Sequence, residues 1–292
     1  MIYNVRHRTT YRYTTPVTFA RCVLRLTPRE TANQQVLETT IAITPRPARS
    51  RTHVGPFGER VMTVAVETAH TELTIEARSR VEVNRPAPML PFDGLGWEAV
   101  REAAFASTAL GLEAPAHFLY PTNAAPVAPP ITAFGLESFL PGRPIVEAAS
   151  DLMRRIKQDF VYDPEATGVR TPAITAFEAR RGVCQDFTHI MIAALRGVGL
   201  PAAYVAGYLR TIPPPGRPRL EGADATHAWV WLWCGEAVGW IGFDPTNDLV
   251  VAGDHIMLAV GRDSTDTAPI DGVILGAGEQ NLKVAVDVAP AM

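Results

Sequence analysis

The sequence predicts an α+β fold in which an antiparallel β-sandwich is followed by helices and then by further strands. Residues 3–83 alternate polar and apolar positions and are rich in Val, Thr, Ile and Tyr, a pattern typical of strands with one buried face. Apolar residues recur at helical spacing only later, at residues 146–160 and 184–196. Beyond residue 202 the pattern is again that of strands. This order favours a sandwich domain followed by a domain in which helices pack on an antiparallel sheet.

A cluster of prolines separates the two predicted domains. Pro86, Pro88 and Pro91 lie close together, and such a stretch fits neither a helix nor a central strand. We therefore expect a β-sandwich N-terminal domain at residues 1–88 and a second domain at residues 89–292. A length of 292 residues agrees with about two domains.

The second domain is expected to begin with a short helix at residues 97–107 and an irregular segment at residues 114–144 that contains seven prolines. A helix is predicted at residues 146–160, and another begins at Thr171, where Thr is the N-cap. The clearest helix is predicted at residues 184–196, with Gly197 and Gly199 as its stop signal. The remaining segments read as strands, at residues 203–209, 227–234, 239–244, 255–260 and 282–288.

Composition and charge exclude several classes of protein. The formal net charge is -3, from 27 basic and 30 acidic residues, which excludes a nucleic-acid-coating protein. The cysteines are Cys22, Cys184 and Cys234, an odd and widely spaced set that argues against a disulfide framework and for a reducing compartment. The sequence shows neither a signal-peptide core nor a run of about 20 apolar residues, so we expect a cytoplasmic protein without a membrane partner. Nothing in the composition indicates an oligomeric state.

Cys184 stands at the start of the clearest helix, on its apolar side. A helix N-terminus has unpaired N–H groups and a partial positive charge, which favour a thiolate. The same N–H groups can stabilise an oxyanion. A cysteine in this position can equally be a buried, inert residue, so the position alone does not assign a function. Cys22 and Cys234 lie in predicted strands and are expected to be small buried residues.

His227 and Asp244 lie at the outer ends of two neighbouring strands of a predicted hairpin. If Gly235 and Glu236 form a two-residue turn, His227 lies directly opposite Asp244, with Cβ atoms about 4.5–5.5 Å apart. If the loop has four residues, Asp244 faces Trp229 and His227 becomes its diagonal neighbour. A slip of one residue would place the two side chains on opposite faces. Either of the first two registers lets a carboxylate orient an imidazole.

Cys, His and Asp in this chain order resemble the transglutaminase-like superfamily, a papain-related thiol fold. The resemblance is closest to its bacterial two-domain branch of transglutaminase-like cysteine proteases, which has a β-sandwich N-terminal domain. The motifs are GVCQDF (182–187), GLPA (199–202), AGYL (206–209), DATHAW (224–229), GFDPTN (242–247), HRTTYRY (7–13), LRLTPR (24–29) and GRD (261–263). The resemblance runs along nearly the whole chain and implies that the helix bearing Cys packs on an antiparallel sheet bearing His and Asp.

The resemblance implies a nucleophile at Cys184, an acid and base at His227 and an orienting carboxylate at Asp244. The implied reaction is hydrolysis of an amide bond in a peptide or protein, or transfer of its acyl group, through a thioester and without a cofactor or a metal. Crosslinking of the protein-glutamine transglutaminase type and a non-catalytic binding module on the same fold remain alternatives.

Further residues are candidates for the substrate site. Tyr162 could be a second donor to the oxyanion, or a packing residue. Asp186 and Asp224 could line the cleft, although an acidic residue near a helix N-terminus often only stabilises the helix dipole. Trp229 shares a strand face with His227 and is expected in the core and cleft wall.

Two other patterns have simpler explanations. A metal site could use Cys184, His189, His227 and Asp244, but positions 184 and 189 do not share a helix face well, and zinc ligands usually have tighter spacing. Alternating arginines at positions 6, 8 and 12 indicate either a polar sheet face or an anionic docking site, and the polar face is the simpler reading.

Overall fold

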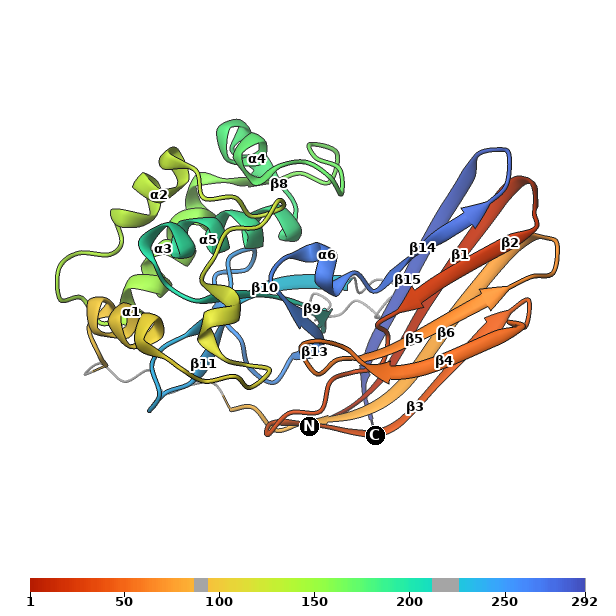
Figure 1. Cartoon of the computed structure of the whole chain (residues 1–292), viewed down its shortest axis with the longest axis horizontal. Coiled ribbons are helices and arrows are strands. Elements are labelled where there is room, and N and C mark those ends of the chain that lie inside the picture. The colour runs from red at the N-terminus through yellow and green to blue at the C-terminus, as the bar shows by residue number, and fades with distance from the viewer. Residues whose placement is uncertain (87–93, 212–225, 292) are drawn as a thin grey trace, which may run out of the picture.

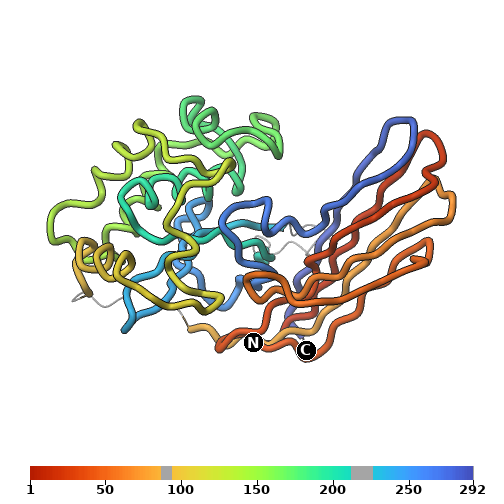
Figure 2. Tube along the Cα trace, in the orientation of Figure 1, coloured from red at the N-terminus to blue at the C-terminus, as the bar shows by residue number. Residues whose placement is uncertain are grey.

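The structure, a computed structural model, describes residues 1–86, 94–211 and 226–291. It has a β-sandwich on one side and a helix-covered sheet on the other (Figure 1). The two ends of the chain run side by side in the sandwich, where Ala291 N donates to Ile2 O at 2.8 Å (Figure 2). The predicted α+β class, with mostly antiparallel sheets, is confirmed.

The sandwich consists of two antiparallel sheets with the strand orders β15-β1-β6-β3 and β14-β2-β5-β4. Their inner faces bury alternate residues of the strands, including Leu24, Val64, Leu73 and Ile75. The strands are β1 (Ile2–Val17), β2 (Phe19–Leu24), β3 (Gln34–Thr44), β4 (Arg49–Val54), β5 (Arg60–Val66), β6 (His70–Val83), β14 (Ile270–Leu275) and β15 (Gln280–Pro290).

The last two strands of the chain complete the sandwich. β15 pairs with β1 from Tyr3↔Pro290 to Tyr13↔Gln280, and β14 pairs with β2. Both segments were expected in the second domain. A strand was predicted at residues 282–288, but alternation does not indicate which sheet a strand joins, and β14 was not predicted as a strand. The division at residue 88 stays a prediction, but residues of the C-terminal end also belong to the sandwich sheets.

The second sheet has the order β12-β11-β10-β9-β13, and all its neighbouring strands are antiparallel. Its strands are β9 (Ala202–Leu209), β10 (Thr226–Trp233), β11 (Trp240–Asp244), β12 (Leu249–Val250) and β13 (His255–Gly261). One face packs on helix α5 (Cys184–Val198) through Ala228, Val230 and Leu232. The opposite face buries Trp229 together with Met257.

The other helices of the described residues are α1 (Trp97–Ala106), η1 (Pro115–Phe118), α2 (Pro129–Leu136), α3 (Ile145–Asp159), α4 (Ala173–Ala179) and α6 (Ser264–Thr267). Helices α2, α3 and α4 pack against α5, and the remaining helices lie farther from it (Figure 1). A short parallel pair, β7 (Val161–Tyr162) and β8 (Arg181–Gly182), precedes α5. In the described residues no helix has both the length and the apolar composition to cross a bilayer.

Three helical details differ from the sequence prediction. The segment expected to be irregular contains η1 and α2, because prolines are tolerated in the first turn of a helix. The N-cap of α4 is Pro172 rather than Thr171. α5 continues through Gly197 to a left-handed cap at Gly199, whose φ is 88°.

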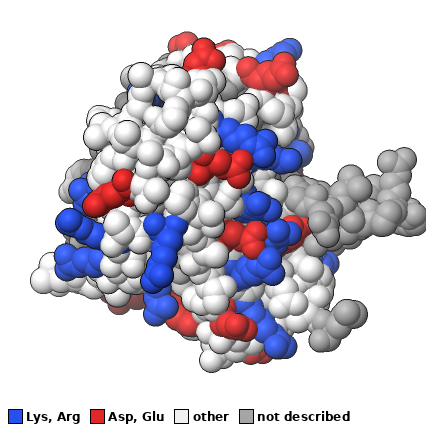
Figure 3. All heavy atoms as spheres, turned by 90° about the vertical axis from the view of Figure 1, so that its right-hand side faces the viewer, with Lys and Arg blue, Asp and Glu red and all other residues white. Residues whose placement is uncertain are grey.

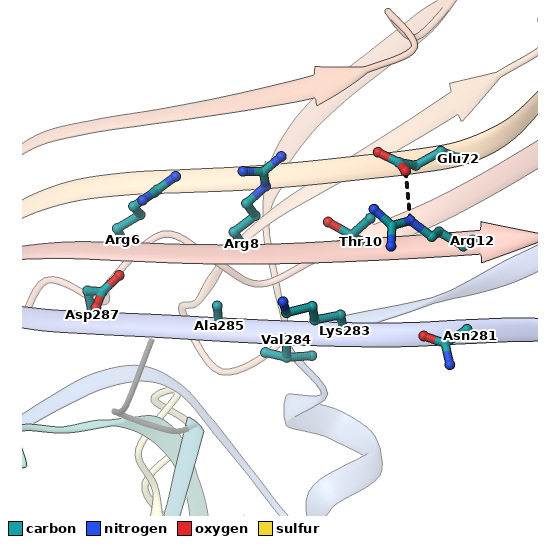
Figure 4. Close-up of a pocket in the computed structure, with 10 residues that line it drawn as sticks. All are labelled: Arg6, Arg8, Thr10, Arg12, Glu72, Asn281, Lys283, Val284, Ala285 and Asp287. Carbon is teal, nitrogen blue, oxygen red and sulfur yellow. Dashed lines mark hydrogen bonds and ion pairs between the residues drawn. The ribbon is translucent and has the colours of Figure 1, made fainter. Parts of the chain in front are cut away.

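The sandwich side of the molecule carries interspersed basic and acidic side chains (Figure 3), and on the outer face of the β1 sheet such side chains pair with one another. Arg6 pairs with Glu76 at 3.0 Å, and Arg12 pairs with Glu72 at 2.9 Å (Figure 4). Exposed pairs of this kind contribute little to stability. The pairing favours the polar sheet face over an anionic docking site.

Candidate active site

Cys184 is the first residue of α5 and is half-buried, whereas Cys22 and Cys234 are buried. Burial raises the pKa of the Cys22 thiol, and it raises the pKa of Cys234 to about 12. Of the three cysteines, Cys184 is therefore the one placed to react in solution.

The start of α5 is held by Asp186. Its Oδ2 accepts hydrogen bonds from Val183 N at 2.8 Å and from Thr167 Oγ1 at 2.6 Å. The Asp186 side chain is 1% exposed. This burial favours the stabilising role that we considered for Asp186 over a contact with substrate.

His227 and Asp244 are in contact. His227 Nε2 lies 2.8 Å from Asp244 Oδ2, and Cys184 is near enough to the His227 ring to affect the pKa of that ring. Because Nε2 faces the carboxylate, Nδ1 is the nitrogen left for the thiol. Burial opposes a charge on His227, but the hydrogen bonds and charges of Asp244 and Cys184 outweigh burial and raise its pKa to about 10.

The hairpin that brings these two residues together has a four-residue loop, so the predicted two-residue turn is wrong. The ladder pairs Trp233 with Trp240 and Val230 with Phe243. Cys234 N donates to Gly239 O at 2.8 Å. Gly239, with a φ of 73°, lets the chain turn beyond the predicted position. Asp244 is thus in the register that makes His227 its diagonal neighbour, and the imidazole spans the remaining gap.

Asp244 is completely buried and surrounded by donors. Its Oδ2 also accepts from His255 Nε2 at 3.2 Å and from Asn247 Nδ2 at 2.8 Å. Its Oδ1 accepts from the backbone N–H groups of Thr246 at 3.0 Å and Asn247 at 3.3 Å. Burial opposes ionisation of Asp244, but these hydrogen bonds and the nearby His227 hold its pKa well below the usual range.

His255 and Asn247 were not predicted from the sequence. His255 begins β13, which is separated from β10 by β9. Gly207 of β9 makes room for the Trp229 ring, because a Cβ there would lie 2.5 Å from that ring, and His255 packs on the same ring. The spacing of residues within β13 does not indicate that His255 contacts Asp244. Asn247, by contrast, lies in the motif around Asp244 and could have been found from its position.

The remaining predicted residues have different surroundings. Tyr162 is 51% exposed, and burial followed by the nearby Cys184 raises the pKa of its phenol. Trp229 is fully buried, with its ring centroid 6.3 Å from that of His227 and 5.2 Å from that of His255. Trp229 therefore packs against the rings of His227 and His255 and presents no surface to a substrate. Asp224 lies outside the described residues.

Among the described residues, His227, Asp244 and His255 form a group with the donor types of a metal site. Both histidines are already hydrogen-bonded to Asp244, and the Asn247 amide donates to the same carboxylate. Hydrogen bonds within the cluster therefore already stabilise the buried carboxylate. His189, considered with Cys184 above, is buried elsewhere and accepts from Ser264 N at 3.2 Å.

The fold and this cluster define a class of protein: an α+β fold with a cysteine at a helix start and a His–Asp pair on the adjoining sheet. The chain belongs to the transglutaminase-like superfamily. Residues 3–82 match the bacterial transglutaminase-like N-terminal region, and residues 139–245 match the transglutaminase-like superfamily core.

Several known proteins are similar to this chain. An uncharacterized protein of Mycobacterium tuberculosis is 39% identical over 99% of this chain and 92% of its own length. A protein-glutamine gamma-glutamyltransferase of Pseudomonas aeruginosa is 35% identical over 103 residues, which are 32% of this chain and 15% of that protein. The solved structure of a candidate cysteine protease from Cytophaga hutchinsonii has a TM-score of 0.75 at 20% identity and covers 100% of this chain and 92% of that one. The last likeness shows the fold.

Proposed function

We propose that this protein is a cysteine-dependent amide hydrolase that acts on a peptide or protein through a thioester. One observation carries the proposal: the His227 ring is held at 2.8 Å by a buried carboxylate and lies near Cys184, whose thiol stands at a helix N-terminus. This arrangement contains a nucleophile, an acid and base, and an orienting group.

In the proposed reaction Cys184 reacts as a thiolate beside the protonated His227 ring, and the sulfur attacks the amide carbonyl carbon. The resulting oxyanion is stabilised by the Cys184 backbone N–H at the helix start and by the Tyr162 hydroxyl. His227 then protonates the leaving amine as the C–N bond breaks, which leaves a thioester. Water attacks the thioester, His227 takes a proton from it, and the thiol and a carboxylic acid are released. Asp244 holds the ring and stabilises the imidazolium.

Crosslinking is the second candidate function. An amine in place of water would convert the same thioester into a new amide, and the Pseudomonas relative is named a protein-glutamine gamma-glutamyltransferase. A non-catalytic binding module is the third possibility, and it predicts that Cys184 does not react faster than an ordinary thiol.

Incubation with a peptide-amide library, with and without a primary amine, would test the proposal by mass spectrometry. We expect cleaved amides with the wild type and none with Cys184→Ser. Activity should survive a chelator and disappear after alkylation. Products that carry the amine instead of water would identify crosslinking, and turnover retained by Cys184→Ser would contradict the proposal.

A further inference from the structure

The start of β13 is held by residues from the N-terminal sandwich. Gln34, in β3, is 2% exposed and clamps Met257, accepting from Met257 N at 2.8 Å and donating through Nε2 to Met257 O at 2.8 Å. Arg85, just after β6, donates to His255 O at 3.1 Å. Tyr3, in β1, donates to Asp254 Oδ1 at 2.8 Å. Three strands or strand ends of the sandwich therefore determine where residues 254–257 lie.

The side chain that this segment carries toward the candidate active site is His255. Its ring is 3% exposed, packs edge-to-face on Trp229 and donates to Asp244 Oδ2. Oδ2 is the oxygen that faces His227. Two imidazoles therefore share one carboxylate oxygen, one from the sheet centre and one from the strand that the sandwich holds.

We propose that His255 is a positioning residue for Asp244, and that the N-terminal sandwich sets its place through Gln34 and Arg85. This inference rests on the proposed function, since it assigns His255 to the machinery around Cys184. It gives the N-terminal sandwich a role in the reaction without any contact with the substrate.

A buried donor on Oδ2, in addition to His227 and Asn247, matters because an aspartate carboxylate rotates easily about its terminal bond, whose torsional preference is broad. The backbone donors at Thr246 and Asn247 hold Oδ1. On Oδ2 the Asn247 amide is a partly exposed donor, whereas His255 is buried and fixed by strand pairing with Leu209. His255 therefore keeps Oδ2 directed at His227 when the imidazolium forms and breaks its bond to the thiolate. A displacement of about 1 Å at such a position can cost roughly 100-fold in rate.

The test measures the rate at which iodoacetamide alkylates Cys184 in the full-length protein near neutral pH, together with the NMR signal of the His227 ring N–H. His255→Phe keeps an aromatic ring on Trp229 and removes the donor, so we expect the rate to fall about 10- to 100-fold and the ring N–H signal to shift. His255→Gln restores a donor near the Nε2 position and should recover most of the rate. Gln34→Leu removes the clamp on Met257 without touching the site, and a smaller fall in the same direction is expected.

The matched control is His7→Phe, which removes a buried imidazole that belongs to the sandwich. The His7 ring is hydrogen-bonded to Tyr208 and Thr9, and within the described part of the chain it makes no bond to Asp244. This variant should alkylate at the wild-type rate, and a fall equal to that of His255→Phe would overturn the proposal. In the Asp244→Asn background, His255→Phe should cause no further loss, whereas independent additive losses would also overturn it.

The two failures are distinguishable. If wild-type Cys184 is unreactive, or if Asp244→Asn alkylates as fast as the wild type, the proposed function fails, and the His227 N–H signal still reports whether His255 positions Asp244. If Asp244→Asn is slow while His255→Phe leaves both the rate and the signal unchanged, the proposed function stands and the inference about His255 is overturned.

Discussion

His227 and Asp244 meet at 2.8 Å although they are diagonal rather than direct neighbours in the hairpin. The ladder ends at Val230 and Phe243, and beyond it the side chains rather than the backbone make the connection. The same carboxylate is completely buried and has donors on both oxygens. Its position is therefore determined by the surrounding fold, and this leads to specific expectations for variants.

Asp244→Asn should fold and should lose turnover by about 100-fold or more, because an amide cannot hold the imidazole tautomer that a carboxylate holds; in serine triads the same change costs about 10⁴-fold. Steady-state rates on an amide substrate measure the loss of turnover, and circular dichroism checks that the variant is folded. Asp159→Asn, at the exposed end of α3, is the matched control and should behave as the wild type. Undiminished turnover in Asp244→Asn would remove this residue from the mechanism.

Stability should depend on pH through His227. Its pKa is raised from 6.5 to about 10: burial lowers it, and the bonds and charges of Asp244 and Cys184 more than reverse this effect. A group of this kind stabilises the folded state fully below its unfolded pKa and loses that contribution as pH rises through its folded pKa. The Tm difference between wild type and His227→Gln should thus be largest near about pH 6 and shrink toward about pH 10. Thermal unfolding at several pH values measures it, and a difference that grows over this range would be the contrary result.

Tyr162→Phe should lower kcat by about 100-fold if the phenol donates to the oxyanion, since one such donor is worth on the order of 10²–10³. The Tyr162 hydroxyl keeps its proton near neutral pH, since the pKa of an ordinary tyrosine is about 10 and burial and the neighbouring Cys184 raise it further. Tyr120→Phe, at a tyrosine that is 64% exposed, provides the comparison. If kcat is the same for both variants, Tyr162 is only a packing residue.

Asp186→Ala should lower the free energy of unfolding by about 1–3 kcal/mol, because it leaves Val183 N and Thr167 Oγ1 without their acceptor. Urea denaturation measures the change. Glu178→Ala, at an exposed position of α4, should stay within about 0.5 kcal/mol of the wild type. An unchanged unfolding free energy in Asp186→Ala would show that this carboxylate does not stabilise the helix start.

Local patterns predicted much of the fold and part of the site. The apolar stripe of α5 placed Cys184 at a helix start, and strand alternation placed His227 and Asp244 on one face. The predicted length of the hairpin turn was wrong. Gly235 and Gly239 can each adopt a left-handed conformation, so the sequence does not decide between a two-residue and a four-residue turn.

Features that depend on which strands become neighbours were missed. His255 reaches Asp244 from a different strand and packs on the Trp229 ring, which occupies the space beside Gly207. β14 and β15 return to the sandwich because the edges of β2 and β1 accept them, which alternation within each strand cannot indicate. α2 was hidden by its prolines, although these lie in its first turn.

The measurement that tests the central claim most directly is competitive alkylation of the folded protein by iodoacetamide near neutral pH, followed by peptide mapping of all three cysteines. We predict that Cys184 is labelled well before the buried Cys22 and Cys234, and that His227→Ala slows its labelling while the other two are unaffected. Labelling of Cys184 at the same rate as the buried thiols, or at a rate that does not depend on His227, would contradict the claim that Cys184 is an activated nucleophile.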